Sequence, residues 1–209
     1  MFFVFDGIDG AGKSTQIELF TQWLRDRNQD VVNCADPGST ALGNRMREIL
    51  LGKTKFPIHV RSEMLMFSVA RTQLVEEIIR PALESGKTVV CDRYFLSTLV
   101  YQGHAGKLSI DDIRAVTRVA VDGVLPDLTF LFDLSVEQSL ARITKDNQEL
   151  DRMESKGTNY LQAVRDGFLT ESKIDLERIA MIDASNSIEQ IQQALRQKAI
   201  PLLEQRGKQ

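Results

Sequence analysis

The stretch FDGIDGAGKSTQ, residues 5–16, holds a glycine at each end of a six-residue span, followed by a lysine and a serine. Gly7, Gly12, Lys13 and Ser14 fit the pattern G-x-x-x-x-G-K-[ST], whose backbone N–H groups close around a phosphate. An apolar run precedes the loop, and apolar residues at helical spacing follow it. A helix that opens here adds its dipole to the attraction for an anion. The stretch therefore predicts a nucleotide-binding loop between a strand and a helix.

Five short apolar runs along the chain are typical of buried strands. They lack the strict apolar–polar alternation of half-exposed strands, which favours a parallel sheet covered on both faces. Helical patterns fill the intervals, and the alternation of strand and helix predicts a doubly wound α/β fold. The expected strands are Phe2–Phe5, Val31–Cys34, Thr88–Asp92, Leu128–Leu134 and Ile179–Asp183.

Three of the helical patterns are long. One runs from Lys13 to about Asn28, one from Val60 to Glu84, and the last from Ser187 to Gln205. Pro81 lies inside the second pattern and is expected to bend that helix or to end its regular part. The sequence contains no repeat, low-complexity tract or linker, so residues 1–209 are predicted to form a single domain.

The composition is that of an ordinary globular protein, with 209 residues, 43% of them apolar and 26% charged. A net charge of −3 and a pI of about 5.5 argue against a nucleic-acid partner but leave room for a small anionic ligand. Cys34 and Cys91 lie beside apolar runs and are interpreted as buried reduced thiols. No signal-peptide pattern opens the chain and no run approaches the length of a membrane span, so a cytoplasmic location is expected.

A metal ion is expected beside the phosphate loop. In loops of this kind the lysine, here Lys13, reaches the β- and γ-phosphates, and the Ser14 hydroxyl coordinates Mg²⁺. Asp92 and Asp133 both follow apolar strand residues and are candidates for a second metal ligand. Asp92 is preferred because Arg93 follows it, and an acid beside a base at a strand's carboxyl end faces the ligand crevice of an α/β sheet.

The segment Lys145–Thr158, KDNQELDRMESKGT, differs from the rest because it holds only two apolar residues. A solvated loop and a mobile lid both fit this composition, which does not choose between them. His59 and His104 have no recognisable metal-ligand spacing and are expected to be structural or exposed.

Several further segments carry a resemblance to a known family. DRYFLSTLVYQG at residues 92–103 resembles the DR-Y/H motif of bacterial thymidylate kinases, and LMFSVARTQ at 65–73 resembles their long helix. PDLTFLFDL, LDRMES and IDAS follow in the family's order and spacing, so the resemblance covers essentially the whole chain. It implies a P-loop NTPase fold with a five-stranded parallel sheet, helices on both faces and a small lid at about residues 145–158.

The resemblance also implies an activity, the transfer of the γ-phosphoryl group of ATP to dTMP with Mg²⁺, in a homodimer. Phe67 matches the aromatic residue that stacks on thymine, and Arg71 lies four residues further on the same helix face. Tyr101 matches an aromatic residue near the sugar, where a 2′-hydroxyl would crowd. The implied dTMP-binding residues are Asp9, Asp36, Arg47, Phe67, Arg71, Arg93, Thr98, Tyr101 and Gln102.

The other implied site residues divide by role. ATP phosphates are expected at Gly7, Ile8, Asp9, Gly10, Ala11, Gly12, Lys13, Ser14 and Thr15. The implied catalytic residues are Lys13, Arg93, Arg152 and Asp9, and the implied metal ligands are Ser14 and Asp92.

Two features depart from the family's pattern. The family commonly reads T-R-E-P-G-G-T after its second strand, whereas this chain reads CADPGST, so that Ala35 replaces an arginine and Asp36 shortens a glutamate. Family members without an arginine in the phosphate loop usually place several in the lid. The lid region here offers Arg142, Lys145 and Arg152, of which Arg152 lies in the matching LDR.

In this interpretation the acceptor of the terminal phosphoryl group of ATP is a nucleoside monophosphate and not water. The acceptor oxygen belongs to a phosphate whose second pKa is about 6, so no general base is needed at neutral pH. Positioning and charge neutralisation would supply most of the catalysis. Two alternatives stay open: a P-loop nucleotide kinase with a different acceptor, and a non-catalytic nucleotide-binding regulator.

Overall fold

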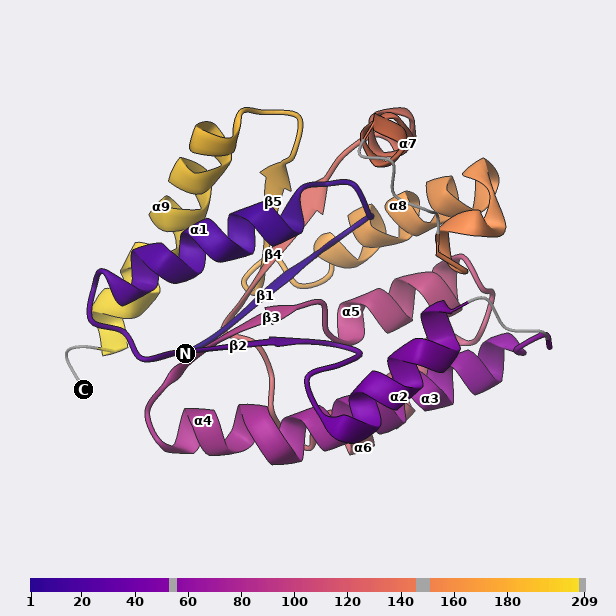
Figure 1. The fold of residues 1–209 in the computed structure, drawn as a ribbon, viewed down its shortest axis with the longest axis horizontal. Helices are drawn as coiled ribbons and strands as arrows, with labels where there is room; N and C mark the ends of the chain where they lie inside the picture. Colours follow the sequence, from indigo (N-terminus) through magenta and orange to yellow (C-terminus); the bar gives the residue numbers. More distant parts are fainter. Residues whose placement is uncertain (53–55, 146–150, 207–209) are drawn as a thin grey trace.

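The computed structural model of the chain describes residues 1–52, 56–145 and 151–206. Its centre is one sheet of five parallel strands in the order β2-β3-β1-β4-β5. This sheet, covered by helices on both faces, confirms the predicted doubly wound α/β fold (Figure 1). The strands are β1 (Phe2–Gly7), β2 (Val31–Ala35), β3 (Thr88–Asp92), β4 (Leu128–Asp133) and β5 (Ile179–Asp183).

Helices α1 and α9 cover one face of the sheet, while α2, α3, α4 and α6 lie on the other side (Figure 1). None of the helices within the described residues has the length and hydropathy that a membrane crossing needs. The helical elements are α1 (Lys13–Arg25), α2 (Ala41–Leu51), α3 (Val60–Leu74), the π-helical η1 (Val75–Ile79), α4 (Arg80–Glu84), α5 (Phe95–Thr98), the π-helical η2 (Leu99–His104), α6 (Ile110–Val121), α7 (Val136–Lys145), the 3₁₀ turn η3 (Glu154–Lys156), α8 (Thr158–Ser172) and α9 (Ile188–Arg206).

Alternate residues of β1 enter two different cores, which is why its sequence is apolar throughout. Phe3 and Phe5 face α1, where Phe5 packs edge-on against Phe20 at 5.5 Å between ring centroids. Phe2 and Val4 face the opposite side and join the core formed with η1 and α4. Burial on both faces removes the alternation that a half-exposed strand would show.

The long helical pattern that contains Pro81 is divided as predicted. Its regular α-helical part ends at Leu74, and η1 follows before Pro81 enters the first turn of α4. The N–H of Arg80 bonds to the carbonyl of Val75, five residues back. This wider turn adjoins the proline, which has no N–H to donate.

Element ends differ from prediction by a few residues. Helix α1 ends at Arg25 and not near Asn28, which adopts a left-handed φ of 59° in the turn that follows. Strand β1 continues to Gly7 because Gly7 still pairs with Phe132 of β4. Strand β4 ends at Asp133, so Leu134 is buried outside the ladder.

The two cysteines are free and buried, as predicted, and lie opposite each other on neighbouring strands β2 and β3. His59 is exposed and its ring accepts a hydrogen bond from Arg61 N at the start of α3. His104 pairs with Glu171 at 2.9 Å. Among the residues described, no group of three or more His, Cys, Asp or Glu side chains is placed to hold a metal ion.

Candidate active site

A pocket of about 640 Å³ lies at the carboxyl ends of β1 and β3. Parallel sheets bind ligands at this edge, where loops from neighbouring strands diverge. The predicted site residues Asp9, Gly10, Gly12, Lys13, Ser14, Thr15, Asp36, Arg47, Phe67, Arg71, Asp92, Arg93, Thr98, Tyr101 and Gln102 line it together. Gly7, Ile8, Ala11 and Arg152, which were also predicted, are not among its lining residues.

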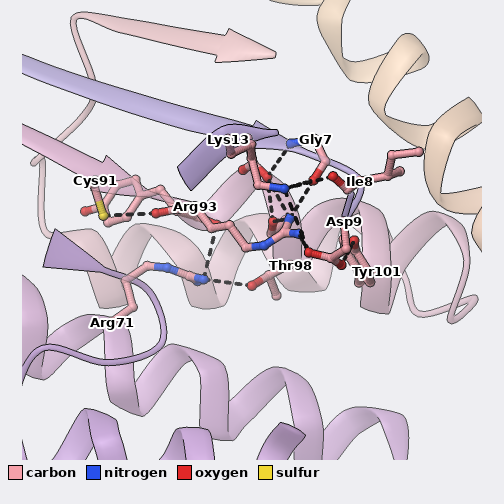
Figure 2. A network of polar contacts seen from close by, with 12 residues as sticks. Gly7, Ile8, Asp9, Lys13, Arg71, Cys91, Arg93, Thr98 and Tyr101 are labelled. Carbon is pink, nitrogen blue, oxygen red and sulfur yellow. Dashed lines mark hydrogen bonds and ion pairs between the residues drawn. The ribbon is translucent and has the colours of Figure 1, made fainter. Parts of the chain in front are cut away.

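The phosphate loop joins β1 to α1, as the sequence predicts. Gly7 has a φ of 133°, and a Cβ atom there would lie 2.4 Å from the Phe132 carbonyl oxygen, so only glycine fits. Gly12 precedes α1 with a left-handed φ of 83°. The buried Lys13 ammonium donates to the carbonyl oxygens of Gly7 at 3.1 Å and Ile8 at 2.8 Å (Figure 2).

Arg93 is held from several sides at the end of β3 (Figure 2). Its guanidinium donates to Gly7 O at 2.8 Å and to Ser97 Oγ at 3.0 Å. It also forms ion pairs with Asp6, at 3.3 Å, and with Asp9. These contacts fix a positive charge beside the phosphate loop.

The close approach of these charged side chains shifts the pKa values of Asp9 and Lys13. Burial acts to raise the pKa of Asp9, but the charges of Arg93 and Lys13 outweigh it and lower the pKa to about 2. Burial and the neighbouring Arg93 charge lower the pKa of Lys13. An anion beside Lys13 would oppose that shift, so phosphate binding would favour the charged form of the lysine.

The candidate metal site consists of Ser14 and Asp92, which both line the pocket. The Asp92 Oδ1 atom is buried and has no hydrogen-bond partner among the described residues. An unpartnered carboxylate oxygen fits Mg²⁺, which takes one or two protein oxygens and completes its shell with water and phosphate.

The far end of the pocket holds Phe67, Arg71 and Thr98. Arg71 Nε donates to Asp36 Oδ2 at 2.6 Å, and its Nη2 donates to Thr98 Oγ1 at 2.8 Å. The remaining nitrogen, Nη1, is buried without a partner in the described part of the chain. Arg71 lines the pocket, and leaving a guanidinium donor unpaired is unfavourable, so an acceptor on a bound ligand that reached this nitrogen would satisfy it.

Tyr101 and Arg47 also line the pocket. The Tyr101 hydroxyl donates to Asp9 Oδ2 at 3.2 Å, and the Arg93 guanidinium lies 5.5 Å from its ring centroid. Arg47 donates to the carbonyl oxygen of Pro37 at 2.9 Å.

The three cations proposed for the lid lie in different places. Arg142 and Lys145 line the pocket, and Arg142 donates to the Ala184 carbonyl oxygen at 3.0 Å. Arg152 donates to Leu50 O at 2.7 Å and pairs with the buried Glu63 at 2.6 Å. Residues 146–150 of the predicted lid lie outside the described residues.

Sequence reasoning missed three polar residues that support the site. Asp6 and Ser97 hold Arg93, and Ser97 Oγ also donates to Asp6 Oδ1 at 2.7 Å. Glu63 holds Arg152 from the first turn of α3. A carboxylate just before the phosphate loop is a visible signal for Asp6, whereas Glu63 resembles an ordinary acidic residue in a helix's first turn.

A phosphate loop that faces several cations across one pocket of a parallel sheet defines a phosphotransferase of the P-loop nucleotide kinase class. A model of the thymidylate kinase family matches residues 5–195. The chain belongs to the thymidylate kinase family, as the motifs in its sequence predict.

Known thymidylate kinases are similar to this chain over nearly its whole length. A thymidylate kinase of Exiguobacterium sp. is 43% identical over 99% of this chain and 97% of its own. One of Symbiobacterium thermophilum is 38% identical over 99% of this chain and 95% of its own. The crystal structure of thymidylate kinase from Ehrlichia chaffeensis matches with a TM-score of 0.71 and 31% identity, covering 87% of this chain and 91% of that one.

Proposed function

We propose that the protein transfers the γ-phosphoryl group of ATP to dTMP, giving ADP and dTDP, a step in the supply of dTTP. One observation carries this proposal beyond family membership. The pocket has a phosphate loop at one end and, at the other, Phe67 beside a buried arginine with an unpaired N–H group. A flat ring with a carbonyl oxygen, such as thymine, complements that second end.

The transfer needs no general base, because the attacking oxygen of dTMP is already largely ionised at neutral pH. Lys13 would meet the β- and γ-phosphates, and Arg93 and Arg47 would bind the acceptor's phosphate. Asp9 would hold Arg93 and the Tyr101 hydroxyl in place near the sugar. Ser14 and Asp92 would hold Mg²⁺, which neutralises charge on the transferring phosphates when it is bound.

A coupled assay of ADP release tests this function against the two alternatives. Release is expected to require a monophosphate and to be fastest with dTMP. With dUMP, which lacks only the 5-methyl group, kcat/KM is expected to be about ten- to two-hundredfold lower. A preference for another monophosphate would indicate a different nucleotide kinase, and ATP binding without acceptor-dependent release would indicate a regulator.

Arg152 is proposed as the lid cation that acts in the closed, reacting complex. Arg152→Ala is therefore expected to lower kcat more than it raises KM for dTMP, since a group that acts mainly in the transition state contributes little to ground-state binding. Steady-state kinetics with dTMP as the varied substrate measure both constants. A change confined to KM would reject the assignment and leave Arg142 and Lys145, which line the pocket, as the candidates.

A homodimer is proposed on the family resemblance and on exposed apolar side chains of α3 and α6. Leu65 and Val69 are 47% and 46% exposed on one face of α3, and Val119 of α6 is 80% exposed. These two helices pack together, so one partner would cover both. Light scattering at micromolar concentration is expected to give twice the chain mass, and the mass of a single chain would refute the dimer.

Two remaining assignments are also proposals. Residues 1–209 form one domain, supported by a sheet whose central strand β1 and covering helix α9 come from opposite ends of the chain. A cytoplasmic location stays a prediction from the sequence, and fractionation of cells would test it.

A further inference from the structure

Glu63 is a buried carboxylate close to the pocket but not part of its lining. It is 1% exposed and stands in the first turn of α3. Two cations meet its Oε1 atom: Arg152 Nη1 at 2.6 Å and Lys156 Nζ at 3.2 Å. Both come from the segment 151–156, far away in the sequence, so the carboxylate joins that segment to α3.

The other oxygen of Glu63 faces the pocket wall. Gln102 Nε2 donates to Glu63 Oε2 at 3.1 Å, and Lys156 Nζ also reaches this oxygen at 3.3 Å. Gln102 is itself buried and lines the pocket. A carboxylate oxygen only accepts hydrogen bonds, so the amide end that faces it must be the NH₂ group. The amide orientation of Gln102 is thus fixed by the chemistry of its neighbour.

The charge on Glu63 is what makes this orientation obligatory. Burial acts to raise the pKa of Glu63, but hydrogen bonds from Arg152 and Gln102 and the charge of Lys156 outweigh it, so the pKa lies below its ordinary value. At neutral pH the side chain is therefore ionised and has no hydrogen to donate to the amide oxygen.

The orientation leaves the Gln102 amide oxygen for a ligand. No hydrogen bond within the described residues reaches that oxygen, and the side chain lines the same pocket as Phe67 and Arg71. An oxygen there accepts from a ring N–H, which the N3 position of thymine offers. Cytosine presents an acceptor at N3, and two acceptors that face each other in a closed pocket are unfavourable.

We propose that Glu63 is a positioning residue for base selection: it holds the Gln102 amide so that its oxygen faces the base, and Arg152 and Lys156 hold Glu63 in turn. This inference rests on the proposed function, because it takes a thymine base as the ligand beside Gln102. It ties the choice of base to Arg152 and Lys156, neither of which lines the pocket.

The direct test is Glu63→Gln, which keeps the shape of the side chain and removes its charge. The introduced amide can accept or donate, so it no longer dictates the orientation of Gln102. The ratio of kcat/KM for dTMP over dCMP is expected to fall at least ~tenfold. The ratio for dTMP over dUMP is expected to stay unchanged, because both bases present the same N3–H and O4 groups.

A second background shows whether Glu63 acts through Gln102. In Gln102→Leu there is no amide to orient, so adding Glu63→Gln is expected to leave the dTMP-to-dCMP ratio as it was. A purely structural effect would lower activity with all three monophosphates together. An unchanged ratio in Glu63→Gln alone, or an equal change in both backgrounds, would overturn the inference.

Folding is checked first, by thermal melting of each variant. Should Glu63→Gln fail to fold, Glu63→Asp replaces it, since the shorter carboxylate keeps a charge near Arg152 and Lys156 while withdrawing from Gln102. The same fall in the dTMP-to-dCMP ratio is expected, and an unchanged ratio overturns the inference. Unsubstituted protein that shows no dTMP-dependent ADP release would reject the proposed function itself, whereas an active kinase with an unmoved ratio rejects only the role of Glu63.

Discussion

Lys13→Ala is expected to give a folded protein whose turnover with ATP and dTMP is at least ~100-fold lower. The substitution removes a charge that would contact the phosphoryl group during its transfer. A donor held in place there stabilises the transition state strongly. The Lys13 side chain is buried and bonded to two carbonyl oxygens of the phosphate loop, so its position is set before any ligand arrives. Melting temperature and steady-state turnover measure the two parts of this expectation.

Lys87→Ala is the matched control for that variant. Lys87 precedes β3, at the opposite end of the sheet from the pocket, and pairs with Asp30 at 3.2 Å on the surface. Its removal is expected to leave turnover within about twofold, because exposed ion pairs contribute little to stability. A Lys13→Ala protein that retains more than a tenth of the unsubstituted turnover would remove Lys13 from the catalytic role.

Arg71→Ala is expected to abolish most of the discrimination between dTMP and dCMP and to lower kcat/KM for dTMP by about 100-fold. Arginine only donates hydrogen bonds, so it suits the O4 carbonyl of thymine and faces the amino group of cytosine with a second donor. A site built around a buried donor rejects a ligand without the matching acceptor far more strongly than an apolar pocket does. Measuring kcat/KM for both monophosphates decides the matter, and an unchanged ratio would contradict this account of specificity.

Stability must be separated from specificity in that variant. Asp36 is 3% exposed and bonded to Arg71, so removing the arginine leaves a buried carboxylate without its partner. Such losses cost about 3–5 kcal/mol of unfolding free energy. Asp36→Asn in the same background is expected to recover part of the melting temperature, while the lost dTMP-to-dCMP discrimination stays lost.

Much of the fold could be predicted because its signals are local. The strands Thr88–Asp92 and Ile179–Asp183 have the predicted bounds, since a short apolar run between polar turns marks both ends of a buried strand. The end of α1 could not be predicted from apolar spacing, because the turn at Asn28 depends on backbone conformation. The pocket residues were predictable where family motifs name them, although their roles remain proposals.

The contacts that hold the site residues in place could not be predicted, for a different reason. Glu63 and Arg152 are 89 positions apart, and Ser97 and Asp6 are 91 apart. Nothing in the sequence around either member of such a pair shows which distant charge it will meet. The ion pair between Arg152 and Glu63 is therefore a property of the packed structure alone.

The clamp on Arg71 has a thermodynamic consequence for ligand binding. A free arginine side chain has about 2 kcal/mol of rotamer entropy to lose when it is immobilised. Asp36 and Thr98 have already immobilised this one during folding, so a base that meets its remaining N–H does not pay that ordering cost again. The Arg71 side chain is therefore ordered before the base binds. Most of the conformational entropy lost on association is then lost by the nucleotide.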